Sequence, residues 1–110
     1  MQITQSDIKG FKVLTIEGEV DLNSSPEMRK VFNDLIDKGA KKIVVSFERV
    51  AYIDSSGLAT LIEMMQRLKK SQGSLYLVQM SEKIKNLFEI TKLDKLFAIY
   101  RTQDEALTVV

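Results

Sequence analysis

Two hydroxyls, a carboxylate and a glycine stand together in Asp54-Ser55-Ser56-Gly57, between an extended apolar segment and an amphipathic helical pattern. The start of a helix leaves backbone N–H groups unpaired and carries partial positive charge, so a serine there can hold an anion, including a phosphate on its own hydroxyl. Aspartate and serine are also preferred helix N-caps in any protein, and capping is the commoner role of such a stretch taken alone. The stretch therefore indicates either a helix cap or a phosphorylation site.

A second polar stretch, Gly18 to Ser25, also follows an expected strand and precedes an expected helix. Taken alone, it is another capped helix start. Binding sites in open α/β sheets gather at the carboxyl ends of strands, so two helices that start at one sheet edge would place both stretches on one polar surface. The partner-binding surface that we expect consists of Asp21, Asn23, Ser24, Asp54, Ser55, Ser56, Gly57 and Leu58.

Catalysis is disfavoured by the residues that are missing. The chain has no histidine and no cysteine, which removes the usual general base, thiol chemistry and the common zinc ligands. Glycine-rich phosphate-binding motifs are absent as well. We expect no cofactor, no metal and no enzymatic activity, although a small enzyme or nucleotide-binding domain built on Asp21 and Asp54 is an alternative.

Composition sets the remaining limits. With 110 residues and 45% hydrophobic residues, the chain is expected to form one domain, residues 1–110, without disulfides. Sixteen basic and 15 acidic residues are scattered along it, so we expect no nucleic acid as a partner. No apolar run approaches the ~20 residues needed to span a bilayer, which predicts no membrane association. A start without signal-peptide character and the lack of cysteine make the cytoplasm the expected location.

Apolar periodicity predicts strands and helices in alternation. The continuous apolar run 42–47 fits a strand that is covered on both faces and central in the sheet. Leu96, Phe97 and Tyr100 are expected in the core. The other strands are expected over 2–8, 11–17, 74–78 and 95–100, with a hairpin turn at Gly10. Helices are expected from Ser25 as N-cap with Pro26 next, from the Asp54–Gly57 turn, from Ser81, and after Thr102 to the last valines. The predicted fold is an α/β sandwich, a mixed sheet of about four to five strands with helices against it.

Three stretches carry a resemblance to a known family: Gly18–Asp21, Tyr52–Leu58 and Leu87–Phe97. In this order and spacing, the chain resembles a STAS domain over nearly its whole length, and specifically the bacterial anti-sigma factor antagonists. The resemblance implies that the serine after the aspartate, Ser55, is phosphorylated by an anti-sigma factor that is a serine kinase, and restored by a metal-dependent phosphatase. Ser56 is the alternative acceptor.

The resemblance also implies how such a protein would work. The unphosphorylated form would bind the kinase and free a sigma factor. A phosphate brings ~1.5 to 2 negative charges into the interface, which favours release. An alternative is a STAS module that docks in another signalling or transport assembly without a phosphoswitch.

Overall fold

The computed structural model describes residues 1–108 and shows one five-stranded sheet with four α-helices. The strands are β1 (Gln2–Ile8), β2 (Phe11–Val20), β3 (Lys42–Ile53), β4 (Ser74–Val78) and β5 (Ala98–Tyr100). The helices are α1 (Ser25–Asp37), α2 (Ser55–Lys70), α3 (Glu82–Ile90) and α4 (Gln103–Leu107), and a 3-10 turn, η1, covers Leu93–Lys95.

The strand order along the sheet is β1-β2-β3-β4-β5. Strand β1 runs antiparallel to β2, and the other neighbours run parallel. The hairpin turns through Lys9 and Gly10, both with positive φ, so Gly10 has the conformation that a tight turn requires. The mixed α/β sheet and the central position of β3 are confirmed.

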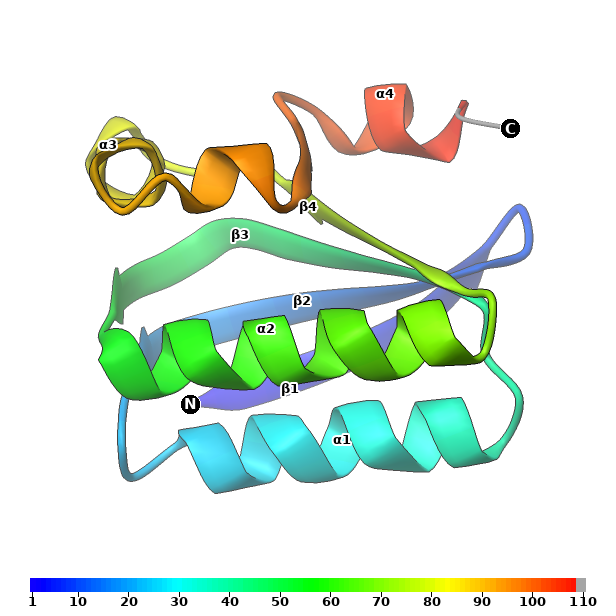
Figure 1. Cartoon of the computed structure of the whole chain (residues 1–110). Coiled ribbons are helices and arrows are strands. Elements are labelled where there is room, and N and C mark those ends of the chain that lie inside the picture. Colours follow the sequence, from blue (N-terminus) through cyan, green and yellow to red (C-terminus); the bar gives the residue numbers. More distant parts are fainter. Residues whose placement is uncertain (109–110) are drawn as a thin grey trace.

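Helices cover both faces of this sheet. Figure 1 shows α1 and α2 side by side along one face and α4 on the other. Successive residues of β3 serve the two faces, since Val45 belongs to the larger core under α1 and α2 and Val44 to a smaller core under α4. Helix α3 adds Ile84 and Phe88 to the larger core, where the Phe88 ring meets Phe47 edge-on with 6.2 Å between centroids. Burial on both faces explains the apolar run of β3.

Three of the four helices start where the sequence predicts, each with a side-chain cap. Asp54 caps α2, Ser81 caps α3 through the Ile84 N–H at 3.3 Å, and Thr102 caps α4 through the Glu105 N–H at 3.2 Å. The predicted end of α4 reaches residues 109–110, which lie outside the described part of the chain.

The prediction for α1 is wrong by one residue. Ser24 is the N-cap, Ser25 is the first helical residue, and neither caps with its side chain. The Ser25 hydroxyl donates to the Asp21 carbonyl at 2.6 Å, and the Ser24 hydroxyl donates to the Glu19 carbonyl at 2.7 Å. Both hydroxyls are thus bound by carbonyls at the end of β2 and in the loop that follows it, and neither is free to cap the helix.

Three strands differ from their predicted bounds. Strand β2 ends at Val20 and not at residue 17. Strand β3 continues to Ile53 because its pairing with β2 extends to Val20 opposite Ile53. The last strand starts at Ala98, not at residue 95, because Lys92 takes a left-handed conformation (φ 61°) and leads into the turn η1. As a result Leu96 is 47% exposed, and its expected place in the core is wrong.

The other two residues expected in the core, Phe97 and Tyr100, are less exposed than Leu96. Phe97 is buried, whereas Tyr100 is half-buried and packs against Tyr76 with 6.1 Å between ring centroids.

Candidate functional site

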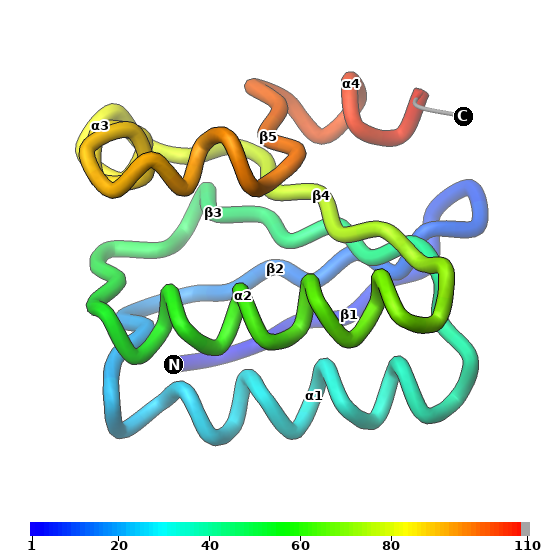
Figure 2. The backbone as a smooth tube through the Cα atoms, viewed as in Figure 1, coloured from blue at the N-terminus to red at the C-terminus, as the bar shows by residue number. Residues whose placement is uncertain are grey.

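The two polar stretches meet at one edge of the sheet. Val20 and Ile53 are paired at the ends of β2 and β3, and the backbone N–H of Asp54 donates to the Val20 carbonyl at 3.0 Å. The backbone trace shows α1 and α2 starting on the same side of the molecule (Figure 2). Asp21 and Asp54 therefore each follow directly after a residue of this strand pair.

Asp54 is bound to the start of α2. Its Oδ1 accepts hydrogen bonds from the backbone N–H groups of Ser56 at 2.9 Å and Gly57 at 3.1 Å. These are two of the N–H groups that a helix start leaves unpaired. Asp54 is thus the N-cap of α2, and the adjacent Ser55 side chain does not cap the helix.

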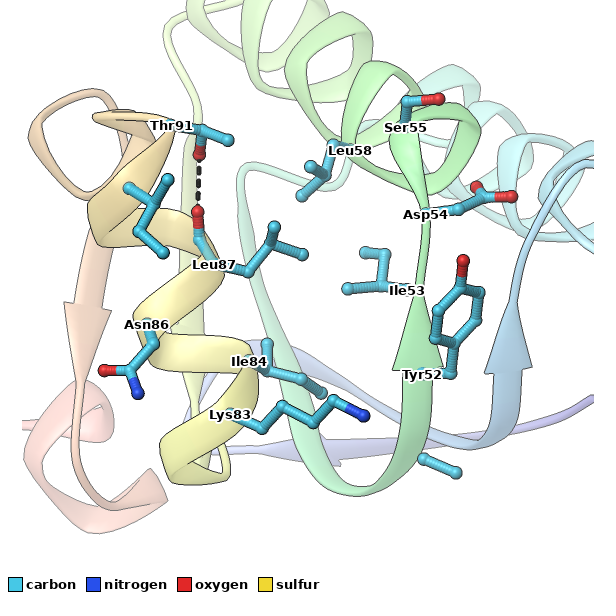
Figure 3. Close-up of a pocket in the computed structure, with 12 residues that line it drawn as sticks. Tyr52, Ile53, Asp54, Ser55, Leu58, Lys83, Ile84, Asn86, Leu87 and Thr91 are labelled. Carbon is cyan, nitrogen blue, oxygen red and sulfur yellow. Dashed lines mark hydrogen bonds between the residues drawn. The ribbon is translucent and has the colours of Figure 1, made fainter.

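Ser55 is the first residue of α2, and its side chain is exposed. Its hydroxyl takes no part in the hydrogen bonds of the turn, and Figure 3 shows the oxygen directed away from α3. Ser56 is half-buried, whereas Gly57 and Leu58 are buried. Of the two serines, Ser55 is the more accessible to another protein.

Gly57 lets the first turn of α2 approach the strand ends. A Cβ atom at this position would lie 2.7 Å from side-chain carbons of Ile53 and Val20 and 3.0 Å from the Val20 carbonyl oxygen. No side chain fits there unless the neighbouring strand moves. The signal in the sequence is a glycine inside the first turn of a helix, a place where its low helix propensity is otherwise a disadvantage.

The loop that carries Asp21 is held by its own hydrogen bonds. The Asp21 carboxylate accepts from the backbone N–H groups of Asn23 at 2.9 Å and Ser24 at 3.0 Å. The Ser24 hydroxyl accepts from the Asp21 N–H at 2.9 Å. The hydrogen bond from the Ser24 backbone, aided by that from Asn23, holds the pKa of the Asp21 carboxyl below its usual value. Asn23 itself is exposed.

The two stretches share one edge but open into different hollows. Asp54, Ser55 and Leu58 line a groove of about 630 Å³ between the start of α2 and helix α3 (Figure 3). Asp21, Asn23 and Ser24 line a separate hollow of about 440 Å³. The expected single polar surface is therefore divided into two neighbouring parts.

Helix α3 supplies part of the site that sequence reasoning missed. Ile84, Leu87 and Ile90 line the groove beside Ser55. Ile84 and Leu87 follow the apolar period of the helix, but Ile90 does not and is 79% exposed. An apolar residue off the buried face of a helix was the available signal.

Neither a metal cluster nor a membrane-spanning helix is found in residues 1–108. No group of three or more carboxylates among them is arranged to hold a metal ion. None of the helices described has the length and apolar character needed to cross a membrane.

Similarity to known proteins identifies the family to which the chain belongs. The model of the STAS domain matches residues 2–106. The anti-sigma-B factor antagonist of Staphylococcus aureus (strain NCTC 8325 / PS 47) is 33% identical over 89 residues, which cover 81% of this chain and 82% of that protein.

Solved structures agree with this similarity. An anti-sigma factor antagonist from Mycobacterium paratuberculosis is 26% identical, with a TM-score of 0.88 over 97% of this chain and 91% of that one. Bacillus SpoIIAA in its phosphorylated form is 24% identical, covers 96% of each chain and has a TM-score of 0.74. Its unphosphorylated form, 22% identical over 94% of this chain and 92% of that one, gives the same TM-score of 0.74, so both forms have this fold. The chain therefore belongs to the STAS domain family, in which its named relatives are anti-sigma factor antagonists.

Proposed function

We propose that this chain is an anti-sigma factor antagonist whose unphosphorylated form binds an anti-sigma factor with serine kinase activity, so that a sigma factor is released. Phosphorylation of Ser55 by that kinase ends the binding, and a metal-dependent serine phosphatase restores it. Support comes from the names of the relatives and from the match of Tyr52–Leu58 to the switch stretch of the family. The observation that carries the proposal is the exposed Ser55 hydroxyl at the start of α2.

Accessibility favours Ser55 as the phosphate acceptor. Phosphoryl transfer requires the acceptor oxygen to lie in line with the γ-phosphate of ATP, so the hydroxyl has to enter the active site of the kinase. Ser55 projects from the surface, whereas Ser56 is half-buried one residue further into the helix. A kinase could therefore reach Ser55 without unwinding α2.

A phosphate on Ser55 would change the surface more than the fold. A negative charge near a helix start is favourable by about 0.3 to 1 kcal/mol. The N–H groups of Ser56 and Gly57 are already occupied by Asp54, and this carboxylate would repel the adjacent phosphate. These effects oppose each other, so we expect a stability change within about 1 kcal/mol. SpoIIAA keeps the same fold in both of its forms, as this argument requires.

Release of the partner needs a much larger effect. A phosphate adds about 1.5 to 2 negative charges, and like charges in an interface cost several kcal/mol. A loss of about 1.4 kcal/mol in binding free energy lowers the affinity about tenfold. A loss of two or three times that amount is therefore enough to release the partner. The same group can thus leave the domain folded and end its binding.

The proposed contact residues divide by role. Ser55 and Asn23 are exposed and would meet the partner directly. Asp21, Ser24, Asp54 and Gly57 shape the two loops through their hydrogen bonds and close packing. Substitutions in the second group should act through loop geometry and domain stability.

The test is phosphorylation by the anti-sigma factor kinase of the same organism. The purified chain is incubated with this kinase, Mg²⁺ and ATP, and the product is mapped by mass spectrometry. We expect one phosphate on Ser55, none on the Ser55→Ala variant, and an unchanged reaction for Ser56→Ala as the matched control. In calorimetric titrations, Ser55→Ala should bind the kinase like the wild type, and Ser55→Asp and Ser55→Glu at least tenfold more weakly.

Two results would speak against the proposal. Equal affinity of the wild type, Ser55→Ala and Ser55→Glu would exclude release by charge. Binding without any phosphorylation would favour the alternative of a docking module that has no phosphoswitch.

A further inference from the structure

The groove beside Ser55 is apolar and concave. Its floor is formed by Ile53, Leu58 and Ile84, which are 4%, 8% and 3% exposed and belong to the larger core. Leu87 is half-buried on the wall that α3 forms, and Ile90 stands at the rim. Figure 3 shows Ile53, Leu58, Ile84 and Leu87 between the start of α2 and helix α3.

Two exposed apolar side chains line this groove. Among the residues that the structure describes, the four exposed large hydrophobic ones are Leu22, Tyr52, Ile90 and Leu96. Leu22 follows β2, Tyr52 precedes the Asp54 cap, and Ile90 faces the groove at 79% exposure. Single exposed apolar residues are normal, but Tyr52 and Ile90 both line one apolar groove, which indicates an interaction surface.

The area that a protein interface typically buries explains why a partner that binds at Ser55 should also contact this groove. A specific complex buries about 800 Å² on each partner, and its affinity comes mainly from large side chains near the centre. The turn Asp54–Gly57 contains only small or capping residues, and Gly57 is buried. Since Asp54 and Ser55 themselves line the groove, a protein that covers Ser55 also covers the groove.

Helix α3 is firmly anchored, so the groove exists before a partner arrives. Phe88 is fully buried between Phe47 and Phe97, with 6.2 Å and 5.8 Å between ring centroids. At the C-terminal end of the helix, the Thr91 hydroxyl donates to the Leu87 carbonyl at 2.7 Å and closes the last turn. A preformed groove lowers the entropic cost of binding.

Lys83 is exposed and lines the same groove. We propose that the anti-sigma factor kinase inserts an apolar side chain into the groove between α2 and α3, with a carboxylate beside it that faces Lys83. This inference rests on the proposed function, because it names how the partner of that same site binds. The apolar contact supplies affinity and α3 supplies specificity, whereas Ser55 supplies regulation. Phosphorylation introduces charge at the edge of a contact that excludes water, where an unpaired anion is least tolerated.

The test compares two exposed apolar residues on different parts of the surface. Ile90→Asp places a charge in the groove, and Leu96→Asp is the matched control, since Leu96 is 47% exposed and lines a different hollow. In titrations with the purified anti-sigma factor kinase of the same organism, we expect Ile90→Asp to weaken binding at least tenfold. Leu96→Asp and the conservative Ile90→Leu should stay within twofold of the wild type. Thermal melts establish that each variant is folded.

A second measurement does not depend on substitution. In two-dimensional NMR spectra of the labelled wild-type chain, adding the kinase should shift or broaden amide signals of residues 83–91 together with those of residues 54–58. Lys83→Glu should weaken binding several-fold, because it reverses the charge that lines the groove.

The outcomes separate this inference from the proposed function. If the wild type binds and responds to Ser55→Glu, but Ile90→Asp binds like the wild type and the α3 signals do not change, the groove proposal alone is overturned. If the wild type does not bind the kinase, the proposed function is overturned and this inference with it.

Discussion

Replacing Asp54 by alanine removes the acceptor of two backbone N–H groups at the start of α2. In the wild type, Asp54 Oδ1 accepts from Ser56 at 2.9 Å and from Gly57 at 3.1 Å. Loss of an N-cap side chain costs about 0.5 to 2 kcal/mol, and loss of a negative charge at a helix start about 0.3 to 1 kcal/mol. Because one oxygen serves two donors here, we expect a loss of about 1 to 2 kcal/mol for Asp54→Ala. Asp54→Asn keeps an acceptor oxygen and should lose less than about 1 kcal/mol.

Thermal and urea unfolding measure this difference. The unfolding entropy is about 2.1 cal/mol/K per residue, so each kcal/mol corresponds to roughly 4 °C in Tm for a chain of this size. Asp54→Ala should therefore melt about 4 to 9 °C below the wild type. Ser81→Ala is the matched control at α3, where the cap makes one hydrogen bond of 3.3 Å, and its loss should be smaller. Ser55→Ala should melt with the wild type, since its hydroxyl is exposed.

The ranking of the variants decides whether this reasoning holds. If Asp54→Ala melts within 1 °C of Ser55→Ala, the two hydrogen bonds do not stabilise the helix start as argued. If Asp54→Asn loses as much as Asp54→Ala, charge and not hydrogen bonding is the main contribution.

Two further predictions concern the same edge of the sheet. Gly57→Ala should destabilise the domain by about 1 to 3 kcal/mol through overpacking against Val20, despite the better helix propensity of alanine, and a Tm at or above that of the wild type would contradict the close approach. Asp21→Asn should lower stability at neutral pH, because the folded state holds the pKa of Asp21 below its usual 3.8, so that the charged form stabilises the fold above that value. This contribution is lost as the pH falls through the lowered pKa. The free energies of unfolding of Asp21→Asn and the wild type should therefore differ at pH 7 and converge in acid. A difference that stays constant with pH would show that the charge of the carboxylate is not involved.

Much of the fold could be predicted because its determinants are local. The type of each element follows from apolar periodicity, and the caps Asp54, Ser81 and Thr102 act on N–H groups two or three residues away. The run 42–47 marks β3 as central because a strand buried on both faces needs apolar residues at consecutive positions.

Errors in the prediction occur where contacts or turns outside the element itself decide. Strand β3 extends to Ile53 only because β2 is there to pair with it, and Leu96 is exposed because the turn after Lys92 redirects the chain. Ser24 replaces Ser25 as N-cap because the Glu19 and Asp21 carbonyls bind their hydroxyls. No local pattern encodes these partners.

The candidate site divides in the same way. By itself, the sequence determined the chemistry of the switch stretch, an aspartate and two serines at a helix start, because side-chain type and position in the helix are local properties. Only the tertiary structure decided that Ser55 is exposed, that Gly57 must lack a side chain, and that Ile90 faces a groove beside Ser55. Exposure, close approach and concavity depend on how β2, β3, α2 and α3 pack together, and that packing brings together residues far apart in the chain.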